Sequence, residues 1–254
     1  MRSAAFLFLA GSLALCLPGA HALEDGETRT PTPIMVSPAE HASAAESASD
    51  AEAKEMAVEQ SQRMMGVVPM FGITSRQNAR PLTSREKFHL WRKTAFDPFQ
   101  AADVAIQAGI SQAQDEFPSY GQGAAGYSKR YAAALTDSVT SGFFANVAYP
   151  VLLKEDPRFF RLGQGSLHRR IAHALTEEFI CHKDAGGRSL HFANILAAVS
   201  SGAVANLYYP PSERGFSLTM NRAAVSLLDG SAGGLLSEFW PDIQARVFRH
   251  SHRQ

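Results

Sequence analysis

An internal repeat constrains the fold of this chain more than any other feature of its sequence. The segments VTSGFFANVAYP (139–150) and VSSGAVANLYYP (199–210) align without a gap, and seven of their twelve residues are identical. Each copy follows a glycine-containing turn and ends at Tyr-Pro, where the proline cannot donate the hydrogen bond that continues a helix. The repeat therefore predicts two related helical hairpins that pack with approximate symmetry. The repeated residues that we expect to be structurally important are Gly142, Asn146, Tyr149, Pro150, Gly202, Asn206, Tyr209 and Pro210.

The glycines and asparagines of the repeat predict how the two copies meet. Gly142 and Gly202 allow a neighbouring helix to approach closely, so we expect both glycines at the contact between the copies. Asn146 and Asn206 each lie four residues before a proline, at a backbone carbonyl that has lost its donor. We expect the two amides to share one hydrogen-bond network in the core. The alternative is that they meet in a polar functional site.

Helical periodicity extends over most of the chain after residue 82. Thr83 and Glu86 match a capping box, and Asp97 before Pro98 matches an N-cap with proline in the first turn. No run of residues alternates between apolar and polar over the length of a strand. The sequence therefore predicts an all-α protein, a single bundle of about six helices. The expected helices span about residues 84–96, 98–113, 126–150, 166–182, 189–208 and 217–239, the last ending before Pro241.

The first residues predict an exported protein. Arg2 is followed by an apolar run over residues 4–17, and residues 20–22 form an A-x-A cleavage site. The run is too short to span a bilayer, so we interpret residues 1–22 as a signal peptide. A lipid anchor on Cys16 is the alternative, which the preceding leucine disfavours because such anchors need a small residue there. We therefore expect the protein in the periplasm or the outer envelope.

Charge and composition divide the rest of the chain. Residues 23–62 carry nine acidic and two basic residues and contain no aromatic residue. Such a segment cannot bury enough apolar surface to offset the entropy of ordering, so we expect a disordered acidic tether with at most a frayed helix near its end. A helical domain over residues 63–243 and a basic tail over residues 244–254 should follow. After cleavage Cys181 is the only cysteine, which excludes an internal disulfide.

Four segments of the predicted domain resemble a family of exported helical proteins common in soil acidobacteria. They are FPSYGQGAAGYSKRY (117–131), EDPRFFRLGQGS (155–166), KDAGGRSLHFANI (183–195) and EFWPDI (238–243). The resemblance extends over about residues 66–243. It implies export and a shared helical fold, and it implies no activity and no catalytic residue.

The predicted helix over residues 166–182 carries side chains that could bind a metal ion. His173, Glu177 and Cys181 recur at i, i+4 and i+8, so an imidazole, a carboxylate and a thiolate would share one helix face. No H-E-x-x-H pair accompanies them, and histidine–carboxylate pairs on exposed helices are common by chance. We therefore predict no metal site and no cofactor. The alternative is an exported hydrolase or metal-dependent enzyme that uses His173 and Glu177.

Three glycines form a pattern that also occurs in nucleotide-binding proteins. Gly121, Gly123 and Gly126 match G-x-G-x-x-G. A dinucleotide site needs this pattern between a strand and a helix, and the preceding Glu-Phe-Pro (116–118) is not typical of a strand. We therefore interpret the glycines as the tight turn before a helix.

Four arginines gather around two phenylalanines. Arg158, Arg161, Arg169 and Arg170 lie within 13 residues. Arginine suits phosphate and carboxylate groups, so this patch is the candidate site for an anionic lipid or a glycan. The alternative, which we favour, is that the phenylalanines (159–160) pack inward while the arginines are solvated. Export and the modest charge exclude nucleic acid as a partner.

Two of the predicted helices raise the question of a membrane. Residues 131–153 contain a single charged residue, Asp137, and residues 189–212 contain none. Both are long enough to cross a bilayer, but they are rich in Ala, Ser, Asn and Gly, which favours the centre of a membrane-associated bundle over inserted helices. The sequence leaves this choice and the oligomeric state open. The leading hypothesis is a non-enzymatic cell-envelope scaffold or binding module.

Overall fold

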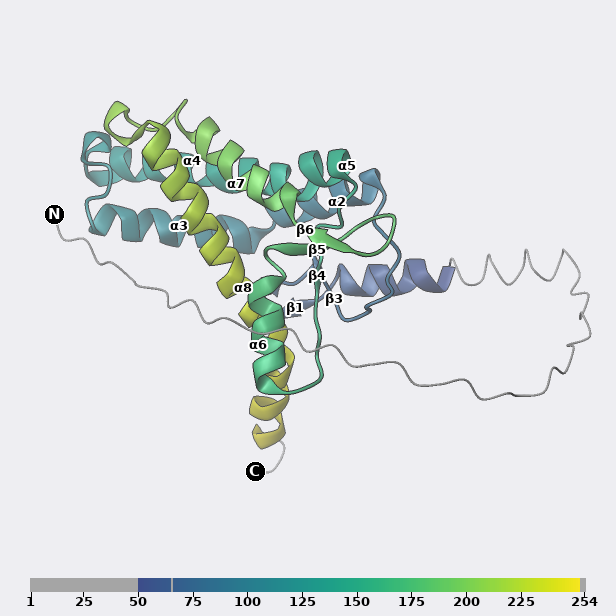
Figure 1. The fold of residues 1–254 in the computed structure, drawn as a ribbon. Coiled ribbons are helices and arrows are strands. Elements are labelled where there is room, and N and C mark those ends of the chain that lie inside the picture. Colours follow the sequence, from purple (N-terminus) through teal and green to yellow (C-terminus); the bar gives the residue numbers. More distant parts are fainter. Residues whose placement is uncertain (1–49, 65, 252–254) are drawn as a thin grey trace, which may run out of the picture. The chain divides into compact units, whose positions relative to one another are not determined.

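Helices form most of the structure, which confirms the predicted all-α fold. The structure is a computed structural model that describes residues 50–64 and 66–251, the side chains of residues 247–251 excepted. The predicted signal peptide and most of the predicted tether lie outside the described residues. A first helix spans residues 50–59 (Figure 1). It is followed by α2 (Ser84–Ala95), α3 (Pro98–Ala113), the 3-10 helix η1 (Pro118–Tyr120), α4 (Gly123–Phe143), the π-helix η2 (Phe144–Ala148), α5 (Tyr149–Leu153), α6 (Leu167–Thr176), α7 (Phe192–Ala205), the 3-10 helix η3 (Pro211–Glu213) and α8 (Phe216–Ser251).

Two helices begin where the sequence predicts. The Thr83 side chain accepts from the Glu86 N–H while the Glu86 side chain accepts from the Thr83 N–H, which completes the capping box of α2. The Asp97 side chain accepts from the Phe99 N–H, and Pro98 occupies the first turn of α3. Both caps satisfy backbone donors that a helix start leaves free, which is why these boundaries can be read from short motifs.

The described strands are short and pair in twos. The strand β1 (Arg63–Met64) is antiparallel to β2 (Val68–Pro69), and β3 (Ile73–Thr74) is parallel to β4 (Phe159–Phe160). Phe160 lies inside the protein with 2% of its surface exposed, whereas Phe159 is only half-buried, so the inward packing that we favoured is complete for one of the two phenylalanines. The hairpin of β5 (Ile180–His182) and β6 (Arg188–Leu190) was not expected.

That hairpin corrects the predicted fourth helix. Instead of extending to residue 182, α6 ends at Thr176. Gly186 and Gly187 both adopt positive φ, which permits the tight turn between β5 and β6. The fifth helix correspondingly begins only at Phe192, after the second strand. The apolar spacing that suggested a helix over residues 167–179 is compatible with a shorter helix that runs into a strand.

The helix over residues 50–59 is packed against the domain, although this segment was assigned to the tether. Met56 is buried in a cluster with Phe71, Leu82 and Leu90. On the same helix, Glu59 forms a hydrogen-bonded ion pair with an arginine that follows β3. The folded domain therefore begins within the acidic segment, where one buried apolar side chain and ion pairs hold the helix in place.

The last helix passes through a proline that we expected to end it. Pro241 lies inside α8, which continues to Ser251 and includes the described part of the predicted basic tail. Arg170 contacts carboxylates on both sides of the proline, with its Nε 2.7 Å from Glu238 and its Nη1 2.5 Å from Asp242. Tertiary contacts thus hold the two segments in one helix where local propensity favours a break.

The helix of the first repeat copy also continues past its proline. After α4 the chain forms the π-helix η2, in which the Tyr149 N–H donates to the Phe144 carbonyl. A π turn shifts the hydrogen-bond pattern by one residue, which accommodates Pro150 and its missing N–H. The short helix α5 then ends before Lys154, which is left-handed at φ 56°.

The helices of the two repeat copies lie against each other (Figure 1). Tyr149 Oη and Ser200 Oγ are 2.6 Å apart across this contact. The helix α4 pairs with the preceding α3, and α7 pairs with the following α8. The first copy is therefore the second helix of its hairpin, whereas the second copy is the first helix of its own. Within the described part of the chain, no helix is both long enough and apolar enough to span a bilayer.

Candidate functional site

A cavity lies between α3, α4, α7 and α8, where the two repeat copies meet. Its volume is about 580 Å³, within the range of sites that bind small molecules. Small residues line it, including Ala108 in α3, Ala134 in α4, and Ala198 and Gly202 in α7. Larger side chains at these positions would fill the space between the helices. The small residues of the bundle therefore leave room for a ligand.

The walls of the cavity combine apolar surface with many polar side chains. Serine side chains come from all four helices, at Ser111 in α3, Ser138 and Ser141 in α4, Ser201 in α7 and Ser226 in α8. Glutamine and asparagine side chains of α3 and α8 add further donors and acceptors. These uncharged groups both donate and accept, so they suit a hydroxylated or amide-bearing molecule better than an apolar one.

Two tyrosines hold an acidic residue of the cavity wall. The hydroxyls of Tyr208 and Tyr209 both donate to the Asp137 carboxylate, that of Tyr209 at 2.5 Å. Burial raises the pKa of Asp137 above its ordinary value, although the tyrosine hydrogen bonds and the charge of Arg222 act to lower it. Burial, together with the Asp137 charge, also raises the pKa of both tyrosines. This network joins the middle of α4 to the segment after α7.

Arg222 of α8 brings a positive charge to the same wall, and part of its guanidinium forms no hydrogen bond in the described structure. Its Nη2 donates to the Glu213 carbonyl at 2.7 Å, and its guanidinium carbon lies 4.5 Å from the centre of the Tyr209 ring. Its Nη1 is buried and has no hydrogen-bond partner among the described residues, and the same holds for Ser111 Oγ. Buried donors without partners are costly, so this wall is prepared for an acceptor that comes from outside the chain.

Arg130, the other arginine of the cavity wall, is fully used by the protein. It is 2% exposed, and it donates to the carbonyls of Glu116, at 2.9 Å from its Nε, and of Gly121, at 2.6 Å from its Nη1. These bonds fasten the glycine turn before α4. A Cβ at Gly126 would lie 2.1 Å from the Gly121 carbonyl oxygen, so this glycine is required for the close approach. The turn follows η1 rather than a strand, as expected for a turn before a helix.

The three residues that were weak candidates for metal ligands do not share a helix face. Because α6 ends before Glu177, Cys181 lies on β5 instead of one turn farther along a helix. His173 Nε2 lies 2.7 Å from the Phe160 carbonyl oxygen, and its Nδ1 lies 3.6 Å from the Glu177 carboxylate. Glu177 is also paired with Arg188. His173 and Glu177 thus belong to a buried ion-pair network, and their grouping with Cys181 is wrong.

Three of the four arginines predicted as an anion-binding patch are engaged inside the protein. Arg158 is buried, and its Nη2 lies 2.7 Å from the carboxylate of an aspartate two residues earlier. Arg161 and Arg170 both donate to the Glu238 carbonyl of α8 at 2.9 Å. Arg169 is exposed. Only Arg169 is therefore solvated as expected, because acidic and carbonyl groups of the protein are the partners of the other three arginines.

The repeated glycines contact different neighbours, which corrects the predicted symmetric contact. A Cβ at Gly142 would lie 3.4 Å from the Trp91 side chain of α2. A Cβ at Gly202 would lie 3.0 Å from the Thr219 carbonyl oxygen of α8. The glycines permit close approach as expected, but each one faces a helix that lies outside the repeat.

The repeated asparagines do not meet either. Asn146 Nδ2 donates to the Gly142 carbonyl of its own helix at 2.9 Å. Asn206 Nδ2 donates to Thr219 Oγ1 at 2.7 Å, and Asn206 Oδ1 accepts from the Gly215 N–H at 2.9 Å. The first amide is thus used locally, whereas the second fastens the start of α8 to the end of α7. The shared network and the shared polar site are both replaced by two separate arrangements.

One residue of the cavity wall could have been identified from the local sequence. Asp137 is the single charged residue in a long stretch of α4 and α5, and such a residue in an apolar helix indicates a partner or a site. Nothing in the local sequence of Arg222 distinguished it, because its role depends on which helix packs against α8. The cavity is therefore recognised from its geometry rather than from a local motif. No protein-family model, no curated protein and no solved structure matches the chain.

Proposed function

We propose that this protein is a non-enzymatic binding module of the cell envelope, and that its four-helix cavity holds a small polar molecule. One observation carries the proposal. Arg222 and Ser111 line a cavity of about 580 Å³, and their buried Nη1 and Oγ atoms lack partners in the part of the chain that the structure describes. A bound molecule with an acceptor group would fill the cavity and would accept a hydrogen bond from the unpartnered guanidinium N–H.

The charges on the wall limit the kind of molecule. Asp137 already accepts hydrogen bonds from two tyrosine hydroxyls. The Arg222 guanidinium is close enough for its charge to act on the pKa of Asp137, which it lowers. A multiply charged anion would be repelled by Asp137 and also by Asp229 of α8, which lines the same cavity. A neutral or singly charged molecule with several hydroxyl or amide groups, of the size of a short glycan, is therefore the proposed ligand class.

Export and a place at the envelope are part of the proposal. They are supported by the apolar run over residues 4–17 and by the A-x-A sequence at residues 20–22. A glycan ligand is consistent with that location. The alternative, an exported hydrolase that uses His173 and Glu177, draws no support from the cavity, because neither residue lines it.

The proposal is tested by measuring binding to the full chain. A panel of neutral monosaccharides and disaccharides, N-acetylated amino sugars and singly charged sugar acids is screened by ligand-observed NMR and confirmed by calorimetry. At least one class should bind, and Arg222→Gln should weaken it by about tenfold or more, because a hydrogen bond to a charged group is lost. Arg169→Gln removes an exposed arginine outside the cavity and serves as the control.

A second variant tests the location of the ligand. Ala134→Phe places a large side chain on the cavity wall, so it should abolish the same binding while circular dichroism shows that the fold is kept. If no class in the panel binds, or if binding persists in both cavity variants, the proposed function is wrong.

A further inference from the structure

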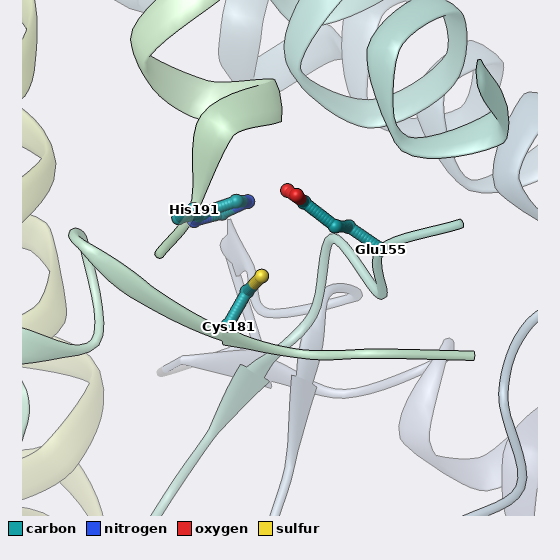
Figure 2. Close-up of side chains that lie close together, drawn as sticks. All are labelled: Glu155, Cys181 and His191. Atoms are coloured by element: carbon teal, nitrogen blue, oxygen red, sulfur yellow. The ribbon is translucent and has the colours of Figure 1, made fainter. Parts of the chain in front are cut away.

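A second cluster of reactive side chains lies apart from the cavity. Glu155 follows α5, Cys181 is the middle residue of β5, and His191 immediately precedes α7. One ligand atom from each side chain lies within 4.8 Å of the other two. Figure 2 shows the three side chains pointing from three different segments towards a common space. None of them lines the four-helix cavity.

Glu155 has an unusual environment for a carboxylate. It is 2% exposed, and its Oε2 accepts from the Ala193 N–H at 3.0 Å in the first turn of α7. In the described part of the chain no lysine, arginine or histidine forms an ion pair with it within 4.0 Å. Lys87, which lies nearby, donates to the Glu155 backbone carbonyl instead. A buried carboxylate needs a cation or strong donors, and here one backbone N–H supplies only part of this.

His191 has the complementary deficit. Both of its ring nitrogens are buried, and neither has a hydrogen-bond partner within residues 50–64 and 66–251. Burial lowers the pKa of this histidine, which favours the neutral imidazole that binds metals. Histidine rings in proteins usually use at least one nitrogen, so two unused nitrogens beside a thiol and a carboxylate call for a common partner.

Cys181 completes the set of donors. It is 3% exposed, and its sulfur lies 3.7 Å from Ser189 Oγ and 3.9 Å from the Leu190 carbonyl oxygen, both weak contacts. Burial raises the pKa of this thiol to about 12, which disfavours a role as a free nucleophile. A thiol in this position is a better metal ligand than a catalytic group, because a bound cation would replace its proton.

We propose that Glu155, Cys181 and His191 bind one Zn²⁺ ion, which fastens the segment after α5 and the β5–β6 hairpin to the start of α7. Carboxylate, thiolate and imidazole are the three ligand types that zinc takes in proteins. Around tetrahedral zinc, with bonds of about 2.0–2.3 Å, ligand atoms lie about 3.3–3.8 Å apart. The present separations of up to 4.8 Å therefore need a closure of about 1 Å.

Charge balance supports this ion. On binding, the S–H bond of Cys181 breaks, an S–Zn bond forms and the proton passes to the solvent. The thiolate and the Glu155 carboxylate together then neutralise Zn²⁺, and the imidazole stays neutral, so the buried site carries no net charge. The fourth position is left for water or a further ligand, as three protein ligands usually imply.

Metal analysis of the full chain tests the proposal. Protein purified with zinc present and passed over a weak chelating resin should retain about one zinc per chain by mass spectrometry. Cys181→Ala and His191→Ala should each lose it. His173→Ala, which removes a histidine of the separate Glu177 network, is the matched control and should retain it.

Cobalt and thermal measurements cover the case in which a variant folds poorly. Chelator-treated wild-type protein titrated with Co²⁺ should develop the thiolate-to-cobalt absorption that only a sulfur ligand produces. Added zinc should raise the melting temperature of the wild type and leave that of Cys181→Ser unchanged. Absence of the thiolate absorption, or retention of zinc in Cys181→Ala, would overturn the proposal. Neither result bears on ligand binding in the four-helix cavity, which shares no residue with this cluster.

Discussion

The two repeat copies have nearly the same sequence at their ends and yet end in different structures. In the first copy the chain stays helical through Pro150, because the π-helix η2 absorbs the missing hydrogen bond. In the second copy α7 ends at Ala205, and Pro210 is extended, with φ −58° and ψ 152°. A further proline, Pro211, follows it, and a residue before proline avoids the helical region. The comparison shows that Tyr-Pro marks a weak point of a helix and does not by itself end it.

The same contrast applies to the side chains of the two copies. The residues of the first copy bind within their own helix or meet movable side chains, as Asn146 and Gly142 do. Those of the second copy bind the backbone and side chains of α8, as Gly202 and Asn206 do, and Tyr209 binds a buried carboxylate. The second copy should therefore be more sensitive to mutation than the first at every matched position.

The largest difference is expected at the glycines. Gly202→Leu should reduce the free energy of unfolding by about 3 kcal/mol, because even a Cβ would lie 3.0 Å from the Thr219 carbonyl oxygen and backbone cannot easily move. Gly142→Leu should cost about 1 kcal/mol, since its nearest neighbour is the Trp91 side chain at 3.4 Å. Urea denaturation of both variants measures the difference. Equal costs would show that the two helix contacts are equally tight.

The asparagines should differ by less. Asn206→Ala should cost about 2 kcal/mol, because it frees the Gly215 N–H and Thr219 Oγ1. Asn146→Ala loses one bond to its own helix and should cost about 1 kcal/mol. The double variant should equal the sum of the two within about 0.5 kcal/mol, since the amides share no partner. A clear departure from additivity in denaturant unfolding would restore the shared network that the sequence suggested.

The smallest difference is expected at the tyrosines, and it should depend on pH. Tyr209→Phe should cost about 1.5 kcal/mol at neutral pH, because Asp137 loses a donor, whereas Tyr149→Phe loses a neutral bond to Ser200 and should cost about 0.5 kcal/mol. Denaturation of both variants at neutral pH and near pH 4 provides the measurement.

The sign of the pH effect follows from Asp137. Its pKa in the folded protein is raised above the ordinary value of about 3.9, so between these two values the folded state holds a proton that the unfolded state has lost. The contribution of this group to stability therefore falls as pH rises through that window. Tyr209→Phe weakens the ionised form more than the protonated one, because a carboxylate accepts hydrogen bonds more strongly than a neutral acid, so its cost should shrink towards pH 4 while the cost of Tyr149→Phe stays constant. A pH-independent cost at both tyrosines would show that Asp137 does not ionise at neutral pH.

The local sequence was sufficient to predict a feature wherever a few consecutive residues satisfy their own hydrogen bonds. Thr83 and Glu86 predicted the start of α2, and Asp97 predicted the start of α3, because each cap is completed within three residues. The helical class followed in the same way from periodicity over ten or more residues. These features would be the same in any fold that contained the segments.

Tertiary structure decided the features for which the partners come from elsewhere in the chain. The β5–β6 hairpin moved Cys181 off the predicted helix and towards Glu155 and His191, which are separated from it by 26 and 10 positions in the sequence. Arg161 and Arg170, which were expected at the surface, contact acidic residues of α8. Arg222 lies near Asp137 only because α8 packs against α7. A local pattern determines which backbone bonds a segment can make by itself. The burial and charge of a side chain depend on neighbours that loop closure brings from a distance, and no local pattern contains them.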